Sequence, residues 1–299
     1  MYPYLDDLMK RLETTSQNRL SKAIGINPSA LSKYLKQSYD GDLDSLNSKV
    51  KTYLELEEQR GDAWDDRIVE TETMRQINKV IRLVHKMRKM GVVYGAAGLG
   101  KTVSLKRYHE DYPNSVMITG CPDSKSVSGA IRLLYYALKR DHSRKSTRQA
   151  RIEIVTLLTG SNTLVIVDDA HELTNDALEE LRSIHDSTSC PFVFVGTEEI
   201  VSRLVDPDAR RILAQMSSRL PVKRIFELAP SGDDFKAVCS AYGIKDREVV
   251  KHLFSKSKQG GLRLAVNQIK IALNIANGTG VTMKDLIQVE GLTGEFVET

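Results

Sequence analysis

The pattern of apolar and polar positions divides the 299-residue chain into three regions. Residues 1–60 carry apolar residues at helical spacing, residues 91–230 alternate short apolar runs with helical stretches, and residues 231–299 return to helical spacing. Alternation of this kind is typical of an α/β domain, whereas the flanking patterns favour helical domains. The sequence therefore predicts an N-terminal helical domain over 1–60, a linker over 61–70, an α/β domain over 71–230 and a C-terminal helical domain over 231–299.

Short runs rich in β-branched residues predict the strands of the α/β domain. They are Gly91–Tyr94, Ser115–Thr119, Leu164–Val167 and Phe192–Val195. Because these runs are apolar on both faces, they suit a central parallel sheet that is covered by helices. An amphipathic helix is expected just before the first strand, at about residues 72–89. Its apolar side would carry Met74, Ile77, Ile81, Val84 and His85.

The C-terminal region shows one apolar helix face and two possible helix starts. Ser231–Asp234 and Thr282–Asp285 resemble capping boxes with Asp in place of Glu. The apolar face runs through Leu262, Ala265, Ile269, Ala272 and Ala276. We expect a small all-helical domain that docks on the α/β domain.

The N-terminal region contains a helix, a short turn and a second helix between Asn18 and Gln37. Gly25 would end the first helix, Asn27 would cap the second, and Pro28 would occupy its first position. The inner faces would be formed by Leu20, Ala23 and Ile24, then by Ala30, Leu31, Tyr34 and Leu35. This is the helix-turn-helix pattern, whose second helix enters the major groove of DNA. A plain helical bundle without a DNA role is the alternative. The outward side chains would be Ser29, Ser32, Lys33, Lys36 and Gln37.

Composition narrows the class of protein. Hydrophobic residues make up 41% and charged residues 27% of the chain, which is ordinary for a soluble globular protein. The formal charge is only +4, so any nucleic-acid site must come from local clustering. Three widely spaced cysteines, Cys121, Cys190 and Cys239, suggest reduced thiols in a cytoplasmic protein. We expect no membrane partner, because we find neither a signal peptide nor a long apolar run.

A nucleotide site is indicated by the stretch Gly95-Ala96-Ala97-Gly98-Leu99-Gly100-Lys101-Thr102, followed by Val103. This is the full G-x-x-x-x-G-K-[ST] pattern of a P-loop, placed between a predicted strand and a helical stretch over Val103–Tyr108. Backbone N–H groups of such a loop close around phosphate oxygens. Lys101 would neutralise the β- and γ-phosphates of ATP, and the Thr102 hydroxyl would hold Mg²⁺.

A second nucleotide motif ends the Leu164–Val167 strand with Asp168 and Asp169. Asp168 would bind Mg²⁺ next to the P-loop. Asp169 lies where P-loop ATPases often carry a Glu that orients the attacking water. Because Asp is shorter by one methylene, we expect slow hydrolysis or a displaced water. The alternative for Asp169 is a cap of the following loop.

Two arginines follow these motifs at positions that suit γ-phosphate contacts. Arg219 comes late in the α/β domain, and Arg263 opens a helix of the C-terminal domain after Gly260-Gly261. An Arg from one subunit can reach the nucleotide of the next subunit in a ring or filament. Either Arg on its own is more often a surface ion-pair partner, but their order after both nucleotide motifs favours the functional interpretation.

With these motifs in order, the chain resembles the transposition protein B family of phage Mu, a target-DNA-binding group within the AAA+ class. The resemblance extends over nearly the whole chain and includes Ser38–Asp42, Val69–Ile77, Ile166–Leu173 and Leu178–Arg182. It implies an arginine finger at Arg219, a second sensor at Arg263 and a first sensor at Thr197. That family more often has Asn at the first sensor, so Thr197 departs from its pattern.

What the resemblance further implies is an ATPase that regulates DNA transposition. Such proteins assemble with ATP as helical filaments on double-stranded DNA, with little sequence preference, and present this target DNA to a DDE transposase that stimulates hydrolysis. The expected partners are therefore double-stranded DNA, the transposase and further copies of the chain.

A basic segment is the candidate site for this DNA. Residues 121–151 carry eight basic and two acidic groups. We expect a basic loop and helix start that contact phosphates, with an ordinary solvated charge run as the alternative. The predicted contacts are Lys125, Lys139, Arg140, Arg144, Lys145, Arg148 and Arg151.

Other functions remain open on the sequence alone. A AAA+ helicase loader or replication initiator would carry the same nucleotide motifs but bind a replicative helicase. An ATP-gated transcription regulator would use the helix-turn-helix to read one short sequence. A small-molecule kinase fits least, because the helical C-terminal region shows no acceptor pocket.

Overall fold

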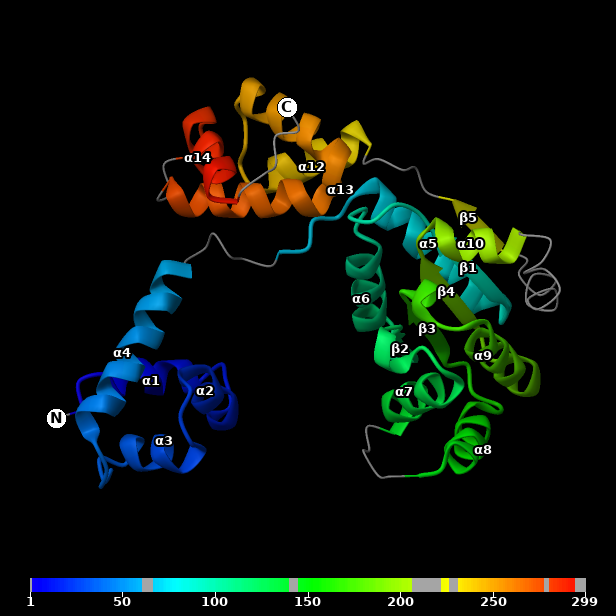
Figure 1. The fold of residues 1–299 in the computed structure, drawn as a ribbon, viewed down its shortest axis with the longest axis horizontal. Helices are drawn as coiled ribbons and strands as arrows, with labels where there is room; N and C mark the ends of the chain where they lie inside the picture. The colour runs from blue at the N-terminus through cyan, green and yellow to red at the C-terminus, as the bar shows by residue number, and fades with distance from the viewer. Residues whose placement is uncertain are drawn as a thin grey trace. The chain divides into compact units, whose positions relative to one another are not determined.

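The computed structural model describes residues 2–60, 67–139, 145–205, 222–225, 231–276 and 280–293 (Figure 1). The chain forms two compact units. The first is Met1–Asp66 with Leu273–Thr279, and the second is Arg67–Ala272 with Gly280–Thr299. The α/β region and nearly all of the C-terminal helices therefore belong to one unit.

The first unit contains the helices α1 (Leu5–Leu12), α2 (Gln17–Ile24), α3 (Pro28–Leu35) and α4 (Leu43–Arg60). Gly25 ends α2 with a φ of 76°, and the Asn27 side chain caps α3 by accepting from the Ser29 N–H. These helix boundaries confirm the prediction for the segment from Asn18 to Gln37. The fourth helix, α4, is 18 residues long and reaches Arg60, the end of the region predicted to be helical.

The core of the first unit gathers apolar side chains from all four helices. Fully buried members include Leu8, Leu31, Tyr34 and Val50. One predicted inner-face residue is wrong, because Ala23 is exposed. Ala23 precedes Ile24, and the helical period turns only the latter toward the core.

The second unit is built around a parallel sheet with strand order β2-β3-β4-β1-β5. The strands are β1 (Met90–Tyr94), β2 (Ser115–Thr119), β3 (Leu164–Asp168), β4 (Phe192–Gly196) and β5 (Val222–Ile225). The four predicted strands are confirmed to within one residue at each end. The edge strand β5 was not predicted.

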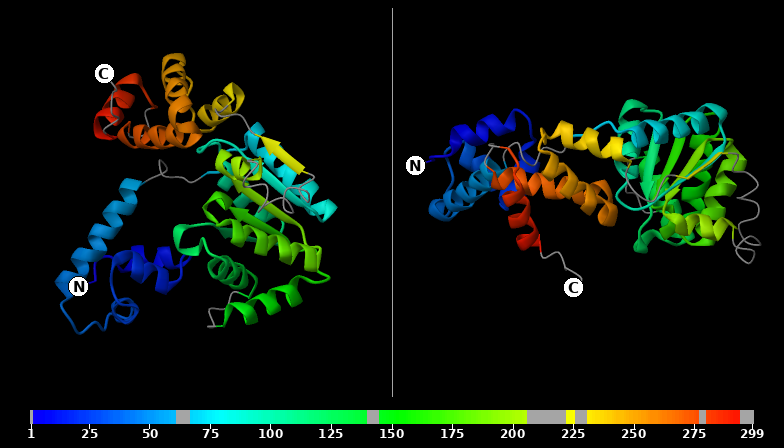
Figure 2. Two further views of the ribbon diagram at one scale, coloured as in Figure 1. Left: turned by 45° about the vertical axis from the view of Figure 1, so that its right-hand side comes forward. Right: turned by 90° about the horizontal axis from the view of Figure 1, so that it is seen from above.

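Helices cover both faces of this sheet, as Figure 2 shows. One face packs on α5 (Glu72–Met87) and α6 (Lys101–Asp111). The opposite face packs on α7 (Val127–Lys139), α8 (Thr147–Leu158), α9 (Asn175–Thr188) and α10 (Glu198–Val205). The five residues predicted for the apolar side of α5 are all buried, which confirms that face. Because all five strands are parallel, their carboxyl ends lie at one edge of the sheet.

The C-terminal part is helical throughout its described residues, in agreement with the prediction. It contains α12 (Gly232–Ala241), α13 (Arg247–Ile275) and α14 (Met283–Thr293). Ser231 and Thr282 cap α12 and α14 as expected. Asp285 completes its capping box, whereas the Asp234 carboxylate turns away to accept from Thr73 on α5. Asp234 is fully buried, and its contact with Thr73 ties α12 to the α/β region.

No helix in the described ranges is both long enough and apolar enough to cross a membrane. The three cysteines are unpaired, with Cys121 exposed and Cys190 and Cys239 buried.

Candidate functional site

The P-loop joins β1 to α6 and is shaped by two glycines in the left-handed region. Gly98 and Gly100 have φ values of 79° and 84°, which other residues adopt only with strain. Leu99 points into the core and is 3% exposed, so only its backbone is available to a phosphate. Gly95 is buried, Ala97 is exposed, and Ala96, Gly98 and Gly100 are half-buried. The loop thus presents backbone at the start of α6, where the helix dipole favours an anion.

Lys101 is the first residue of α6 and is almost fully buried. Its Nζ donates to the backbone oxygens of Gly95 at 2.8 Å and Ala96 at 2.7 Å. Burial lowers the pKa of this ammonium, while Asp168 and Asp169 oppose the shift and Arg263 adds to it. The lysine is therefore folded back over the P-loop and lies in the electrostatic range of both acids and of Arg263.

Asp168 ends β3 at the same edge of the sheet and is 1% exposed. Its Oδ1 accepts from the Asp169 N–H at 3.0 Å, whereas its Oδ2 is buried without a hydrogen-bond partner in the described part of the chain. Burial raises the pKa of this carboxyl above its usual value, and the neighbouring Thr102 hydroxyl and Lys101 charge oppose that rise. Asp169 follows in the left-handed region with a φ of 46°.

These residues fit a magnesium ion chemically. A buried carboxylate oxygen without a partner faces a large desolvation cost, which a cation removes. Carboxylate and hydroxyl oxygens are the ligands that Mg²⁺ prefers, and the Thr102 hydroxyl belongs to the same electrostatic cluster. Asp168 and Thr102 are thus the residues that could hold the ion.

The strand order shows what separates β3 from the strand that leads into the P-loop. β4 lies between β3 and β1, yet the Thr102 hydroxyl and the Lys101 charge of the P-loop both act on the Asp168 carboxyl, as its predicted place next to the P-loop requires. The last residue of β4, Gly196, accepts from the Gly95 N–H at 3.3 Å. Thr197 is the next residue and is half-buried. Because parallel strands end at one edge, Thr197 lies at the same edge as the P-loop and the two acids, and its role as a first sensor stays a prediction.

The C-terminal helices meet the P-loop through glycines. A Cβ added at Gly98 would lie 2.6 Å from the Gly260 backbone oxygen, and one added at Gly261 would lie 2.9 Å from the Ala97 backbone oxygen. Gly261 has non-helical angles that kink α13 at this point. Arg263 begins the next turn and is exposed. Backbone therefore packs directly on backbone, which brings Arg263 near the nucleotide site.

Val103 and Arg219 are the remaining residues predicted for the nucleotide site. Val103 is 41% exposed on the first turn of α6. Arg219, the predicted arginine finger, lies outside the described residues.

The basic segment is only partly available to DNA. Lys145 is paired with Glu153 and lies 5.5 Å from the Tyr135 ring centre. Arg151 bonds Glu180 and Ser183 across to α9, so it holds helices together. Among the remaining predicted contacts, Arg140 and Arg144 lie outside the described residues.

The exposed members of this segment do not form one group. Lys139 is the last residue of α7 and Arg148 is the second residue of α8, and these two helices pack together. Lys125 lies at the opposite end of α7, about 20 Å away at 1.5 Å per helical residue. Lys139 and Arg148 are therefore the pair that could contact one stretch of phosphates.

The first unit places polar side chains on the outside of α3, as predicted. Ser29, Lys33 and Lys36 are exposed, and Ser32 is half-buried. Lys33 pairs with Asp40 at 2.8 Å, and this contact lowers the pKa of the Asp40 carboxyl. The structure contains the two predicted helices, α2 and α3, and the role of the outer face of α3 in binding DNA stays a prediction.

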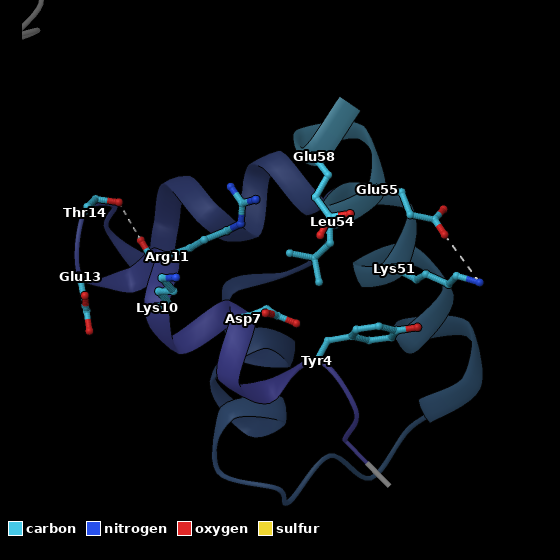
Figure 3. Close-up of a pocket in the computed structure, with 10 residues that line it drawn as sticks. All are labelled: Tyr4, Asp7, Lys10, Arg11, Glu13, Thr14, Lys51, Leu54, Glu55 and Glu58. Carbon is cyan, nitrogen blue, oxygen red and sulfur yellow. Dashed lines mark hydrogen bonds and ion pairs between the residues drawn. The ribbon is translucent and has the colours of Figure 1, made fainter. Parts of the chain in front are cut away.

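A separate groove of about 540 Å³ lies in the first unit between α1 and α4 (Figure 3). Its lining carries both signs of charge, and Lys51 pairs with Glu55 inside it. None of the lining residues among the described ones belongs to α3. The mixed charge does not favour a polyanion such as DNA.

One residue close to the site was missed from the sequence. Arg203 on α10 bonds the loop that follows Asp169, at His171, Leu173 and Asn175. An arginine on a helix after an apolar strand carries no motif, so only the folded structure reveals this contact.

Comparisons with known proteins agree with this geometry. Residues 84–204 match the family described as AAA domain. The chain is 28% identical over 253 residues to the "Mu-like prophage FluMu DNA transposition protein B" of Haemophilus influenzae, covering 82% of this chain and 87% of that protein. It is 26% identical over 272 residues to the "ATP-dependent target DNA activator B" of Escherichia phage Mu, covering 90% and 86%.

The fold is also found among solved structures. A Walker-type ATPase of Pyrococcus abyssi matches with a TM-score of 0.50 at 12% identity, over 78% of this chain and 77% of that chain. At this identity the likeness speaks for the fold alone. Together with the AAA domain it confirms the predicted fold class, an α/β nucleotide-binding core with helical flanks.

Proposed function

Because this chain is a homologue of the Mu transposition B proteins and carries a AAA domain, we propose that it is an ATPase that activates target DNA for transposition. The observation that supports the proposal is that residues from separate segments converge at one sheet edge. Lys101 of the P-loop acts on Asp168 at the end of β3, and Thr197 follows the strand between them. The relatives' printed names connect ATP with target DNA.

The site residues divide the work of binding and hydrolysis. The P-loop amides and Lys101 would hold the phosphates of ATP, and Asp168 with Thr102 would hold Mg²⁺, which supplies charge neutralisation at the β- and γ-phosphates. Asp169 would orient the attacking water, and Thr197 and Arg263 would contact the γ-phosphate. To reach a phosphate, the Lys101 ammonium must leave the Gly95 and Ala96 oxygens. Burial disfavours the charged form of this lysine, and the negative charge of a phosphate would offset that cost.

DNA binding in this proposal is largely independent of sequence. Lys139 and Arg148 supply phosphate contacts next to the ATPase core, and Ser29, Ser32, Lys33 and Lys36 on α3 supply a second set. ATP would assemble further copies into a helical filament on double-stranded DNA, with Arg219 completing the site of a neighbour. The filament would then present this DNA to a DDE transposase.

The test is an anisotropy titration of a random-sequence duplex with ATP, with ADP and without nucleotide. The proposal expects binding that needs ATP, ignores sequence and weakens steeply with salt, by ~0.9 in log K per neutralised phosphate per tenfold change in salt. Binding confined to one short sequence would instead favour an ATP-gated transcription regulator.

A variant of the P-loop lysine separates nucleotide gating from plain DNA affinity. Lys101→Ala is expected to abolish ATP binding and, with it, assembly on DNA. Lys106→Ala, an exposed lysine further along α6, serves as the matched control and should behave like the wild type. Filaments that persist with Lys101→Ala would refute nucleotide gating.

A further inference from the structure

The turn that carries Asp169 holds a backbone conformation that needs support. Asp169 has a φ of 46° and begins a single 3₁₀ turn, Ala170–Glu172. A left-handed non-glycine residue costs on the order of 1 kcal/mol or more, and it persists only where the surroundings hold it. Within the turn, the Glu172 N–H donates to Asp169 O at 3.0 Å, and the Leu173 N–H donates to Ala170 O at 3.3 Å. These local bonds leave the next carbonyls of the loop to be satisfied elsewhere.

Arg203 satisfies them from outside the loop. Its Nη1 donates to His171 O at 2.9 Å, its Nη2 donates to Leu173 O at 2.8 Å, and its Nε donates to Asn175 Oδ1 at 2.9 Å. The planar guanidinium thus spans the loop from the middle of the 3₁₀ turn to the first residue of α9. A lysine offers one charged nitrogen and cannot reproduce this fork.

The guanidinium is also partly removed from water. Burial lowers the pKa of Arg203 from its usual value, and the charge of Glu199 opposes that shift. A charged donor in such surroundings bonds neutral carbonyls more strongly than an exposed one does. The contact is therefore a built feature of the fold.

The other end of α10 connects the same loop to the first sensor. α10 begins one residue after Thr197, at the end of β4. The last residue of β4, Gly196, packs so closely on the loop that a Cβ there would lie 3.2 Å from the His171 Nδ1. Arg203 and Gly196 thus hold one loop from two points on the β4–α10 segment. The turn with Asp169 and the residue Thr197 are fixed relative to each other.

We propose that Arg203 is a positioning residue for ATP hydrolysis, which fixes the turn bearing Asp169 in register with Thr197. This inference rests on the ATPase activity proposed above. Arg203 does not contact the nucleotide in this scheme. Arg203 determines the position of the Asp169 carboxylate, and it therefore affects the rate of hydrolysis and not the affinity for ATP.

The test compares Arg203→Gln and Arg203→Lys with a matched control. Arg182→Gln removes another hydrogen-bonded arginine, whose partners, Glu179 and Asp186, lie on its own helix α9. We expect both Arg203 variants to lower kcat by about ten- to a hundredfold, the range typical of residues that orient a site through its ligands. The Kd for ATP should stay within about twofold of the wild-type value. Arg182→Gln should keep both constants.

Hydrogen exchange of the backbone amides over residues 169–175 gives a second readout that does not depend on turnover. Arg203→Gln should speed exchange in this loop, whereas Arg182→Gln should not. Wild-type kcat in the Arg203 variants would overturn the inference, as would a fall in kcat matched by an equal loss of ATP affinity. If the wild type itself hydrolyses no ATP, the proposed function fails, and unchanged exchange in the loop would still overturn the positioning role.

Discussion

Substitution of Gly261 by alanine tests whether the C-terminal helices must dock on the P-loop for ATP to bind. Gly261 has a φ of 69° and a ψ of −169°, a region that is essentially restricted to glycine. The added Cβ would lie 2.9 Å from Ala97 O and 2.9 Å from the Gly98 Cα, and both are backbone atoms that cannot turn aside. The docked arrangement must therefore strain or separate.

The size of the effect follows from the backbone conformation. An alanine in this region costs about 1–3 kcal/mol, which corresponds to about a 5- to 150-fold change in an equilibrium constant. If Arg263 reaches the nucleotide only in the docked arrangement, the affinity for ATP falls by a factor in this range. The assay is a titration with a fluorescent ATP analogue, with urea unfolding measured in parallel.

Two glycines of the same region serve as controls. Gly243 also has a left-handed φ, of 71°, but nothing lies within 4 Å of an added Cβ. Gly243→Ala therefore carries a backbone cost without the clash at the P-loop. Gly291 lies in α14 with open space around it, so Gly291→Ala should be neutral or slightly stabilising. The reasoning is refuted if Gly261→Ala binds ATP as tightly as both control variants do.

Further predictions concern hydrolysis, thiol reactivity and DNA. Asp169→Asn keeps a residue that tolerates the left-handed region. It should leave ATP binding unchanged and slow hydrolysis by about a hundredfold or more, the loss typical of a missing general base; equal turnover would assign Asp169 to loop capping. The Ser124 hydroxyl holds the pKa of the exposed Cys121 thiol below its usual value, whereas burial raises the pKa of Cys239 to about 11. Because the thiolate is the nucleophile, iodoacetamide at pH 8 should modify Cys121 first and leave Cys239 intact, and mass spectrometry of the native protein checks this. Lys139→Glu with Arg148→Glu should weaken duplex binding and reduce its salt dependence, whereas Lys236→Glu, on an exposed lysine of α12, should not; equal affinity in all three proteins would remove the α7–α8 end from the DNA-binding surface.

The spacing of apolar residues predicted two kinds of element, helices with one buried face and strands that are buried on both faces. The five predicted positions of α5 recur at helical spacing and are buried, whereas the apolar Leu83 and Met87 lie outside that face and are exposed. The inner strands β1, β3 and β4 are buried at every residue. β5 escaped prediction because Val222–Ile225 is short and places two basic residues between two apolar ones. Such a segment becomes a strand through its pairing with β1, and sequence pattern does not record pairing.

The candidate site was predictable only where a motif fixes the chemistry. The P-loop glycines and Asp168 have roles that their neighbours in sequence define. Charge density along residues 121–151 could not show that Arg151 is bonded to α9, since Glu180 is distant in sequence. The same limit applies to the approach of Gly98 and Gly261, which depends on how α13 packs after folding.

The conformation of Asp169 offers a physical reason for the shorter acid at this position. Asp and Asn enter the left-handed region more readily than longer side chains do, because their short polar groups can bond locally. With a φ of 46°, a glutamate here would gain one methylene of reach at a backbone cost. A shorter side chain also has fewer rotamers with which to correct a misplaced backbone. The position of the carboxylate is then determined by the turn, and the turn is the part of the site that Arg203 holds.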